Sequence, residues 1–297
     1  MTSLGQTHSD RVLGELADQM ETLTPQLQKV ARYVLDNPRD VSVSTVREIA
    51  TAANVKPNTV VRMARQIGFD GYEEFRAPFR EAIRQGEASF PDRARWLQSI
   101  QKKSGMGPLY ADMINSALEN IEQTFAGIDE ADFSAAASAI WNSRSVLTLG
   151  VGVNHANACN FTYLARTGMV QFEAIPRPGS TALDDLAWVD ERDVLIVMTS
   201  RPYRAEVVEA VKVAKEQGVC IVALSDSPAS PIIRLAQHKF ILAADTPQFF
   251  PSSVSTIAVL ETLLSFVIAL ASDKIVMRVD EFHRRRHEHG FYCESDS

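Results

Sequence analysis

The chain has 297 residues, a hydrophobic content of 45% and a formal net charge of -7 at pH 7. This length suits one large or two ordinary domains, and the hydrophobic content is ample for a buried core. An evenly spread negative charge would exclude most nucleic-acid partners. The first 80 residues, however, carry as many Lys and Arg as Asp and Glu residues, so the acidic excess lies in the remainder.

Three cysteines, Cys159, Cys220 and Cys293, lie far apart. Their odd number and wide spacing fit free thiols in a reducing cytosol and match no metal-ligand pattern. The first residues lack the apolar segment of a secretory signal. We therefore expect a cytoplasmic protein.

Two helices are predicted before residue 40. Residues 9–21 have a short amphipathic pattern. Thr24 is placed to cap the next helix and Pro25 to open it, because a proline loses no hydrogen bond in the first turn. This helix covers residues 26–36, and Asn37-Pro38 ends it, since the residue before a proline disfavours the helical conformation.

Residues 45–69 carry the pattern of a helix-turn-helix. An apolar stripe at helical spacing is followed by a short break at residues 53–55 and by Pro57 at the start of a second helix. Gly68 marks the end of that helix. The apolar side chains expected to face inward are Val60, Val61, Ala64 and Ile67. Such a pair of helices can enter a DNA major groove, which predicts operator DNA as a partner.

Side chains at the start of the second helix reach base edges in this arrangement. The candidates for base contacts are Lys56, Asn58, Thr59 and Arg62, and those for phosphate contacts are Ser44, Thr45 and Arg65. The alternative is an ordinary pair of surface helices, in which Arg62 and Arg65 are solvated charges.

Further along, residues 71–84 predict one more helix despite Pro78, and the glycine- and charge-rich residues 86–107 predict a linker. Helices are then expected at residues 109–124, 129–142, 155–166, 205–217 and 253–271, and strands at 146–149, 170–174, 193–199, 219–224 and 240–243. Strands separated by helices of 10–15 residues favour an α/β fold, a doubly wound parallel sheet flanked by helices.

The longest apolar run, residues 254–271, contains Glu261 and several Ser and Thr residues. These polar positions predict a buried core helix rather than a membrane span. The same helix is our candidate for a dimer interface. Residues 283–289, rich in His and Arg, predict a solvated C-terminal tail rather than a metal site.

The N-terminal part resembles the DNA-binding domain of the RpiR (MurR/RpiR) family of bacterial transcription regulators. The matching segments are LTP at residues 23–25, NP at 37–38, REIA at 47–50, TVVR at 59–62 and GFDGYEEF at 68–75. The C-terminal part is similar to the SIS (sugar isomerase) domain that this family uses as a sensor. The segments that match there are LTLGVGVNHANA at 147–158, VLIVMTS at 194–200 and residues 205–236.

The resemblance implies a helix-turn-helix domain at residues 1–85, a linker at 86–107 and a SIS effector-binding and dimerisation domain at 108–297. It further implies a bacterial regulator that binds operator DNA, senses a small anionic metabolite such as a phosphosugar, and forms a homodimer or homotetramer. No catalytic residue, cofactor or metal is expected.

The loops that would hold the effector depart from the SIS pattern. Asn154 stands where a Ser usually follows the Gly-x-Gly turn, and a loop that is normally rich in Ser, Gly and Thr contains Arg201 and Arg204. Two guanidinium groups can bind an anion bidentately, so the ligand is a phosphate held differently, a carboxylate or a sulfonate. The effector-binding candidates are Gly150, Gly152, Asn154, His155, Thr199, Ser200, Arg201, Arg204, Ser252 and Ser253.

Each of these residues also has a purely structural alternative. The glycines can serve turn geometry, the arginines can form ion pairs with Glu206 or Glu209, and the serines can cap helices. Two other functions stay open: a sugar-phosphate isomerase, and a DNA-binding protein whose sensor is vestigial. An isomerase needs a base beside the sugar carbonyl, and the candidates Glu206, His155 and His238 form no recognisable constellation.

Overall fold

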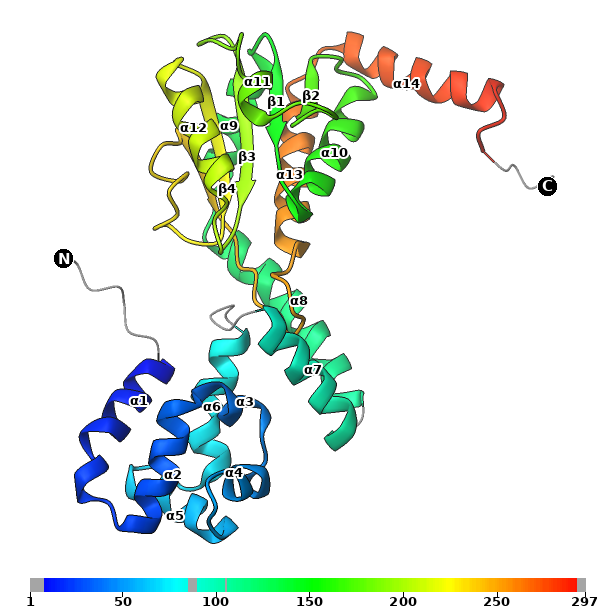
Figure 1. Cartoon of the computed structure of the whole chain (residues 1–297). Coiled ribbons are helices and arrows are strands. Elements are labelled where there is room, and N and C mark those ends of the chain that lie inside the picture. The colour runs from blue at the N-terminus through cyan, green and yellow to red at the C-terminus, as the bar shows by residue number, and fades with distance from the viewer. Residues whose placement is uncertain (1–7, 85–89, 105, 293–297) are drawn as a thin grey trace. The chain divides into compact units, whose positions relative to one another are not determined.

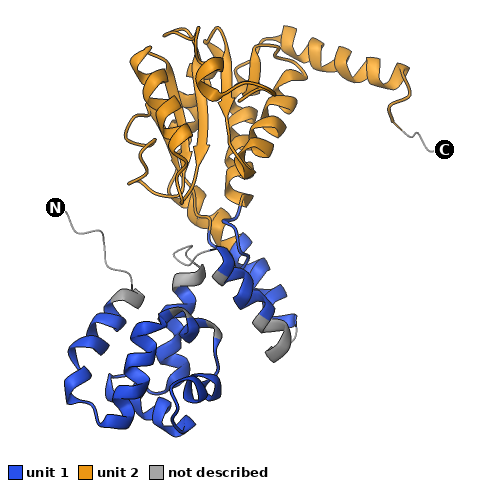
Figure 2. Ribbon diagram, in the orientation of Figure 1, with its two compact units in different colours: residues 1–117, 245–252 blue, residues 118–244, 253–297 orange. Residues whose placement is uncertain are grey.

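The computed structural model describes residues 8–84, 90–104 and 106–292 (Figure 1). The chain divides into two compact units (Figure 2). One unit comprises residues 1–117 with 245–252, and the other comprises residues 118–244 with 253–297. A short segment late in the sequence thus belongs with the N-terminal unit, which the sequence did not indicate.

The first unit is helical. Its elements are α1 His8–Asp18, η1 Met20–Thr22, α2 Pro25–Asp36, α3 Pro38–Val43, α4 Val46–Ala52, α5 Pro57–Gln66, α6 Tyr72–Arg84, α7 Phe90–Ser104 and the first half of α8 Gly107–Ala126. Leu16, Val30, Ile49, Met63 and Phe75 are completely buried in the core shared by the helices α1 to α6. Except for α3 and α7, these helices follow the predicted segments closely.

The two exceptions have a physical reason. Asn37-Pro38 does end α2, but Pro38 also opens α3, because the first position of a helix tolerates proline as well as any residue. Most of the predicted linker forms α7, in which Arg93 and Trp96 are only 1% and 3% exposed. A segment with two buried large side chains is part of a folded core rather than a spacer.

The second unit contains a five-stranded parallel sheet with the order β2-β1-β3-β4-β5. The strands are β1 Val146–Leu149, β2 Phe172–Ile175, β3 Val194–Thr199, β4 Cys220–Ser225 and β5 His238–Ile241. In register, Val146 of β1 lies between Phe172 and Val194. The predicted doubly wound parallel sheet is confirmed.

Helices cover both faces of this sheet (Figure 1). The helices α9 Glu130–Trp141, α10 Val153–Arg166 and α13 Val254–Ala269 pack on one face, and α11 Ala182–Asp185 and α12 Ala205–Glu216 pack on the other. Side chains of β3 alternate between the faces, Ile196 toward α13 and Leu195 and Val197 toward α12, as strand geometry requires. Buried Val259 and Leu263 confirm α13 as a core helix.

Residues 273–288 form the helix α14, which includes most of the predicted solvated tail at residues 283–289; those residues are largely exposed but helical. Its side chain at Ile275 is buried, and Cγ2 of this residue would lie 2.9 Å from a Cβ added to Gly168. Ion pairs along the helix, such as those of Arg284 with Glu281 and Glu288, support the rest of it. Among the described residues no single helix could cross a membrane, although α13 and α14 pass by length and composition as a pair bent by 119°.

Candidate DNA-binding and effector sites

The turn between α4 and α5 has a defined hydrogen-bonding pattern. Asn54 adopts a positive φ of 52°, a conformation that asparagine tolerates better than most residues. The N–H of Val55 donates to the Ala50 carbonyl at 2.8 Å, and that of Asn54 donates to the Thr51 carbonyl at 3.1 Å. This is a Schellman motif, which ends α4 sharply and lets Pro57 open α5 three residues later.

Helix α5 presents a polar, cationic side to solvent. Val60, Met63 and Ala64 are buried toward α2 and α4, while Asn58 and Arg62 are exposed. Lys56 is the exposed N-cap, Thr59 is half-buried, and no acidic residue lies in the first turn. The inward positions were thus predicted correctly except that Val61 is only half-buried and Met63 was missed.

Three candidates for phosphate contacts also have structural roles. The Thr45 hydroxyl caps α4 in a capping box: it accepts the Glu48 N–H at 3.3 Å and donates to the Glu48 carboxylate at 2.8 Å. The Ser44 carbonyl accepts the hydroxyl of Tyr72 at 3.0 Å. Arg65 is exposed, and its Nε donates to the Asp70 carbonyl at 2.9 Å.

Arg76 of helix α6 hydrogen-bonds to the carboxyl end of α3, just before α4 begins. The guanidinium of Arg76, 9% exposed, donates from Nε and Nη2 to the Ser42 carbonyl at 3.1 and 2.9 Å. A cation at the carboxyl end of a helix satisfies carbonyls that have no partner within the helix. Because Ser44 and Thr45 directly follow α3, this contact fixes where α4 begins.

In the second unit the strand order reverses between β1 and β3, since β2 lies beyond β1 and β4 lies beyond β3. At such a switch point the loops after the two strands diverge and leave a crevice at their carboxyl ends. The loops concerned contain Gly150 and Gly152 after β1, and Arg201 and Arg204 after β3. Eight of the ten effector candidates lie in these two loops or next to them.

Both glycines in the turn after β1 are required by its geometry. A Cβ added to Gly150 would lie 2.1 Å from the carbonyl oxygen of Asn154, so no larger residue fits there. Gly152, the N-cap of α10, has φ 64° and ψ -126°, a conformation that side chains disfavour. Within the described part of the chain no side chain caps this end of α10.

The polar residues at the start of α10 contact one another. The amide of Asn157 donates to Oδ1 of Asn154 at 3.2 Å. The Nδ1 atom of His155 lies 3.2 Å from the Gly150 carbonyl, and its Nε2 lies 3.5 Å from Sγ of Cys159. A carbonyl can only accept, so Nδ1 carries the proton and holds the ring against the turn.

The two arginines after β3 have carboxylate partners. Nε of Arg201 lies 2.8 Å from Oδ2 of Asp226, and Nε of Arg204 lies 2.7 Å from Oε1 of Glu206. Each guanidinium is 56% exposed, so each pair is weak in water, at about 0–1 kcal/mol. Nη1 of Arg204 would lie 3.5 Å from a Cβ added to Gly152, which brings this guanidinium beside the turn after β1.

The remaining candidates are distributed differently. Thr199 is 4% exposed, and its carbonyl accepts the hydroxyl of Ser225 at 2.7 Å; Ser200 is half-buried. Ser252 belongs to the first unit and is half-buried, while Ser253 is the N-cap of α13 in the second unit. The structure therefore brings together Gly150, Gly152, Asn154, His155 and Arg204.

Two family models match the chain: a helix-turn-helix domain of the rpiR family at residues 11–86, and a SIS domain at residues 139–269. A regulator of Haemophilus influenzae is 27% identical over 78% of this chain and 80% of its own length, and RpiR of Escherichia coli is 22% identical over 84% and 83%. Both are named HTH-type transcriptional regulators.

The chain belongs to the RpiR family.

Two solved structures agree with this assignment. The sugar isomerase domain of an RpiR transcription factor from Sphaerobacter thermophilus is 27% identical, covers 59% of this chain and 98% of its own, and has a TM-score of 0.56. NanR of Vibrio vulnificus, solved with ManNAc-6P, is 20% identical, covers 93% of this chain and 98% of its own, and has a TM-score of 0.54. The latter shows a shared fold. This RpiR-family chain is thus a transcriptional regulator with a helix-turn-helix domain and a SIS domain.

Two residues beside the crevice were missed in the sequence. Asp226, the partner of Arg201, follows β4, and Tyr203 lies in the loop after β3. Burial and the adjacent Asp226 carboxylate together raise the pKa of Tyr203. The position of Asp226 immediately after an apolar strand was an available signal, because the carboxyl ends of parallel strands share one edge of the sheet.

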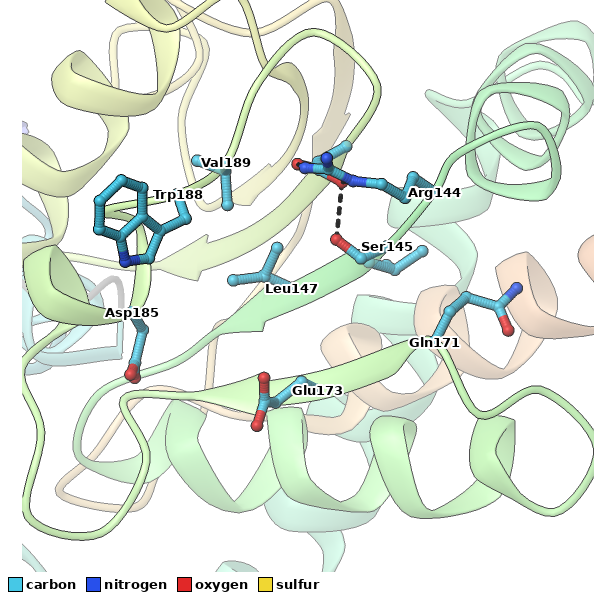
Figure 3. A pocket seen from close by; sticks show the side chains of 10 residues that line it. Arg144, Ser145, Leu147, Gln171, Glu173, Asp185, Trp188 and Val189 are labelled. Atoms are coloured by element: carbon cyan, nitrogen blue, oxygen red, sulfur yellow. Dashed lines mark hydrogen bonds and ion pairs between the residues drawn. The ribbon is translucent and has the colours of Figure 1, made fainter.

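A pocket of about 170 Å³ lies at the opposite, amino edge of the sheet (Figure 3). Leu147 and Val189 lie between the Trp188 indole on one side and Gln171 on the other. Trp188 is 91% exposed, so this side of the pocket is open. Since no effector candidate lines the pocket, it provides no support for the predicted site. Among the described residues no cluster of His, Cys, Asp and Glu could hold a metal ion.

Proposed function

We propose that this RpiR-family regulator binds a small anionic metabolite at the carboxyl ends of β1 and β3 and changes its operator binding in response. The observation that carries this proposal is the position of Arg204. Its Nη1 would lie 3.5 Å from a Cβ on Gly152, beside the amino end of a 14-residue helix that no described side chain caps.

Charge at this position favours an anion. The amino end of α10 carries a partial positive charge, and its first N–H groups have no carbonyl partner within the helix. A guanidinium beside them adds a full charge and a planar pair of donors suited to phosphate or carboxylate. Arg201 is the second cation of the same loop. An effector with two or more anionic oxygens can replace the weak pairs of these arginines with Asp226 and Glu206.

A protein with a similar fold indicates which class of effector should be tested first. NanR, whose fold this chain shares, was solved with a phosphosugar, ManNAc-6P. Phosphosugars are therefore the first compounds to test, followed by sugar acids and sulfonates, since arginines stand where SIS domains usually have hydroxyl groups. The named relatives are regulators, and we infer a sensor without catalysis.

On the DNA side, we propose that α5 enters the major groove. Lys56, Asn58, Thr59 and Arg62 are the candidates for base contacts, and Ser44, Thr45 and Arg65 for phosphate contacts. Helix-turn-helix proteins bind paired half-sites, so the regulator acts as a homodimer or a larger symmetric assembly in the bacterial cytoplasm. The effector changes operator affinity only if it binds one arrangement of the DNA-binding domains better than another.

A thermal-shift screen tests the sensor. Wild-type protein is screened against phosphosugars, sugar acids and sulfonates, alongside Arg204→Met and the matched control Arg234→Met, an exposed arginine away from the two loops. A true effector at 100 times its Kd stabilises the folded state by about 2.7 kcal/mol, or a Tm rise of about 5–10 °C. We expect this rise in wild type and Arg234→Met and its loss in Arg204→Met. An equal rise in all three proteins would refute the assigned site.

The DNA-binding proposal has its own test. Wild-type protein selects operator sequences from a pool of random duplexes, and the selected duplex is then titrated with Arg62→Ala and with the control Arg80→Ala, an exposed arginine on α6. Loss of one base contact costs about 1–3 kcal/mol, so Arg62→Ala should bind roughly 5- to 150-fold more weakly. If Arg62→Ala binds as well as Arg80→Ala, α5 is not the reading helix.

A further inference from the structure

Helix α8 buries several polar residues and exposes several apolar ones. Its inward residues are the polar Ser116, Asn120 and Thr124, each no more than 2% exposed. The Thr124 hydroxyl accepts the N–H of Ala243 at 2.9 Å, and the Asn120 carbonyl accepts the hydroxyl of Ser255 at 3.1 Å. These two hydrogen bonds hold the polar inward residues of α8 against Ala243 and Ser255. The exposed apolar residues of α8 are therefore not needed for these contacts.

Several apolar residues of this helix, and Met106 just before it, are exposed on its outer side. Met106, Tyr110, Ile114 and Leu118 recur every four residues, and they are 58%, 71%, 43% and 58% exposed. Residues four apart lie above one another on a helix, so these side chains form one continuous outer stripe. Met113, 38% exposed, lies at its edge. A helix that faces solvent alone normally shows the opposite pattern, with polar residues outward.

The size and composition of this α8 stripe are those of a protein interface. With about 200 Å² for each fully exposed side chain, the five residues expose roughly 500 Å². Two such surfaces bury roughly 1,000 Å², the lower bound for a specific interface. The stripe contains no charged residue, and it is rich in tyrosine and methionine, which are enriched in interfaces.

We propose that α8 pairs with α8 of a second copy of this chain across a twofold axis. A single apolar stripe is complementary to its own copy under such symmetry, because each residue then contacts its counterpart surface. A helix of 20 residues is about 30 Å long, and paired helices pack 8–10 Å apart, so the stripes meet along most of their length. This inference rests on the proposed homodimer and names its interface as α8, whereas the sequence had suggested α13.

Sedimentation equilibrium of the full-length chain tests the pairing. Ile114→Asp and Leu118→Asp each place a charge in the stripe, and Asn115→Asp adds the same charge at an exposed position outside it. We expect wild type and Asn115→Asp to be dimeric at micromolar concentration. Each stripe variant should raise the dimer Kd at least 100-fold while its circular dichroism and melting stay those of the wild type.

A monomeric wild type overturns the proposal, and so does a folded Ile114→Asp or Leu118→Asp variant with an unchanged dimer Kd. Two stripe positions are used so that misfolding of one variant leaves the other to decide. Failure of the proposed function is seen separately, in the DNA selection and the thermal-shift screen. A chain that dimerises through α8 but selects no DNA would refute the regulator and leave the interface intact.

Discussion

Replacing Gly150 with alanine should destabilise the second unit severely. The added Cβ would lie 2.1 Å from the carbonyl oxygen and 2.5 Å from the carbonyl carbon of Asn154, both backbone atoms of α10. An ordinary contact at this position is about 3.4 Å or more, so the start of the helix would have to move by more than about 1 Å. Overpacking a core costs about 1–3 kcal/mol, and a backbone that cannot rotate away places this substitution at about 3 kcal/mol or above.

Alanine substitutions at two other glycines should have smaller or opposite effects, because a Cβ has more room there. At Gly152 a Cβ meets only Nη1 of Arg204 at 3.5 Å, so Gly152→Ala costs mainly backbone strain at φ 64°, about 1–3 kcal/mol. Gly14, within α1 of the first unit, has open space around it. Gly14→Ala should therefore stabilise by about 0.5–1 kcal/mol through its better helix propensity.

Differential scanning calorimetry on the full chain measures these effects. For a domain of this size, 1 kcal/mol corresponds to about 2–4 °C, so Gly150→Ala should lower the transition of the second unit by about 6–12 °C. Gly14→Ala should raise only the transition of the first unit. If Gly150→Ala melts within about 2 °C of wild type, the close approach of α10 to β1 is wrong.

Three further predictions concern buried charges. The Asp193 carboxylate accepts hydrogen bonds from Arg144 Nε at 3.0 Å and from the Ser145 hydroxyl at 2.7 Å. Asp193→Ala removes both and should lower the free energy of unfolding, measured with urea, by about 2–4 kcal/mol. A decrease of less than about 1 kcal/mol would contradict this. Burial alone would raise the pKa of Asp193, but these hydrogen bonds lower it overall. The contribution of Asp193 to the free energy of unfolding is therefore fully present above about pH 5 and is lost as the pH falls below about 4. In Asp193→Asn the free energy of unfolding should depend less on pH over this range. The Arg93 side chain is 1% exposed, and its Nη2 lies 2.6 Å from the Thr246 carbonyl. In thermal melts of the first unit, Arg93→Met should lower the free energy of unfolding by less than about 1 kcal/mol and Arg93→Ala by about 2–4 kcal/mol. Equal decreases in the two variants would refute a packing role for this side chain.

Local signals in the sequence predicted much of this molecule. The helix-turn-helix follows from Pro57, Gly68 and the apolar spacing between them, because caps, turns and one-sided burial act within a few residues. The five strands follow from short apolar runs for the same reason. In contrast, α14 was missed although Ile275, Val279 and Phe282 recur at helical spacing, because the His- and Arg-rich residues at its end favoured a solvated tail.

The candidate effector site was only partly predictable. That the loops after β1 and β3 share an edge follows from a parallel sheet, and the sequence indicated both loops. The approach of Arg204 to Gly152, however, joins residues 52 positions apart and depends on the order in which the strands pair. The pairing of Arg201 with Asp226 is equally non-local. Without the strand order, Asp226 could not be chosen as the partner of Arg201 from several acidic residues of similar sequence context.

Two contacts within the first unit fix the segment before α13 to α7. Arg93 of α7 holds the carbonyl of Thr246, and Phe90 of α7 stacks on Phe250 with ring centroids 4.2 Å apart. Four residues after Phe250 the chain begins α13, whose Ser255 hydroxyl donates to the Asn120 carbonyl of α8. The hydrogen bond between Ser255 and Asn120 lies within the second unit and joins α13 to the helix of the proposed dimer interface. An effector at the loops after β1 and β3 changes operator binding only if it binds one arrangement of the dimer more tightly than another.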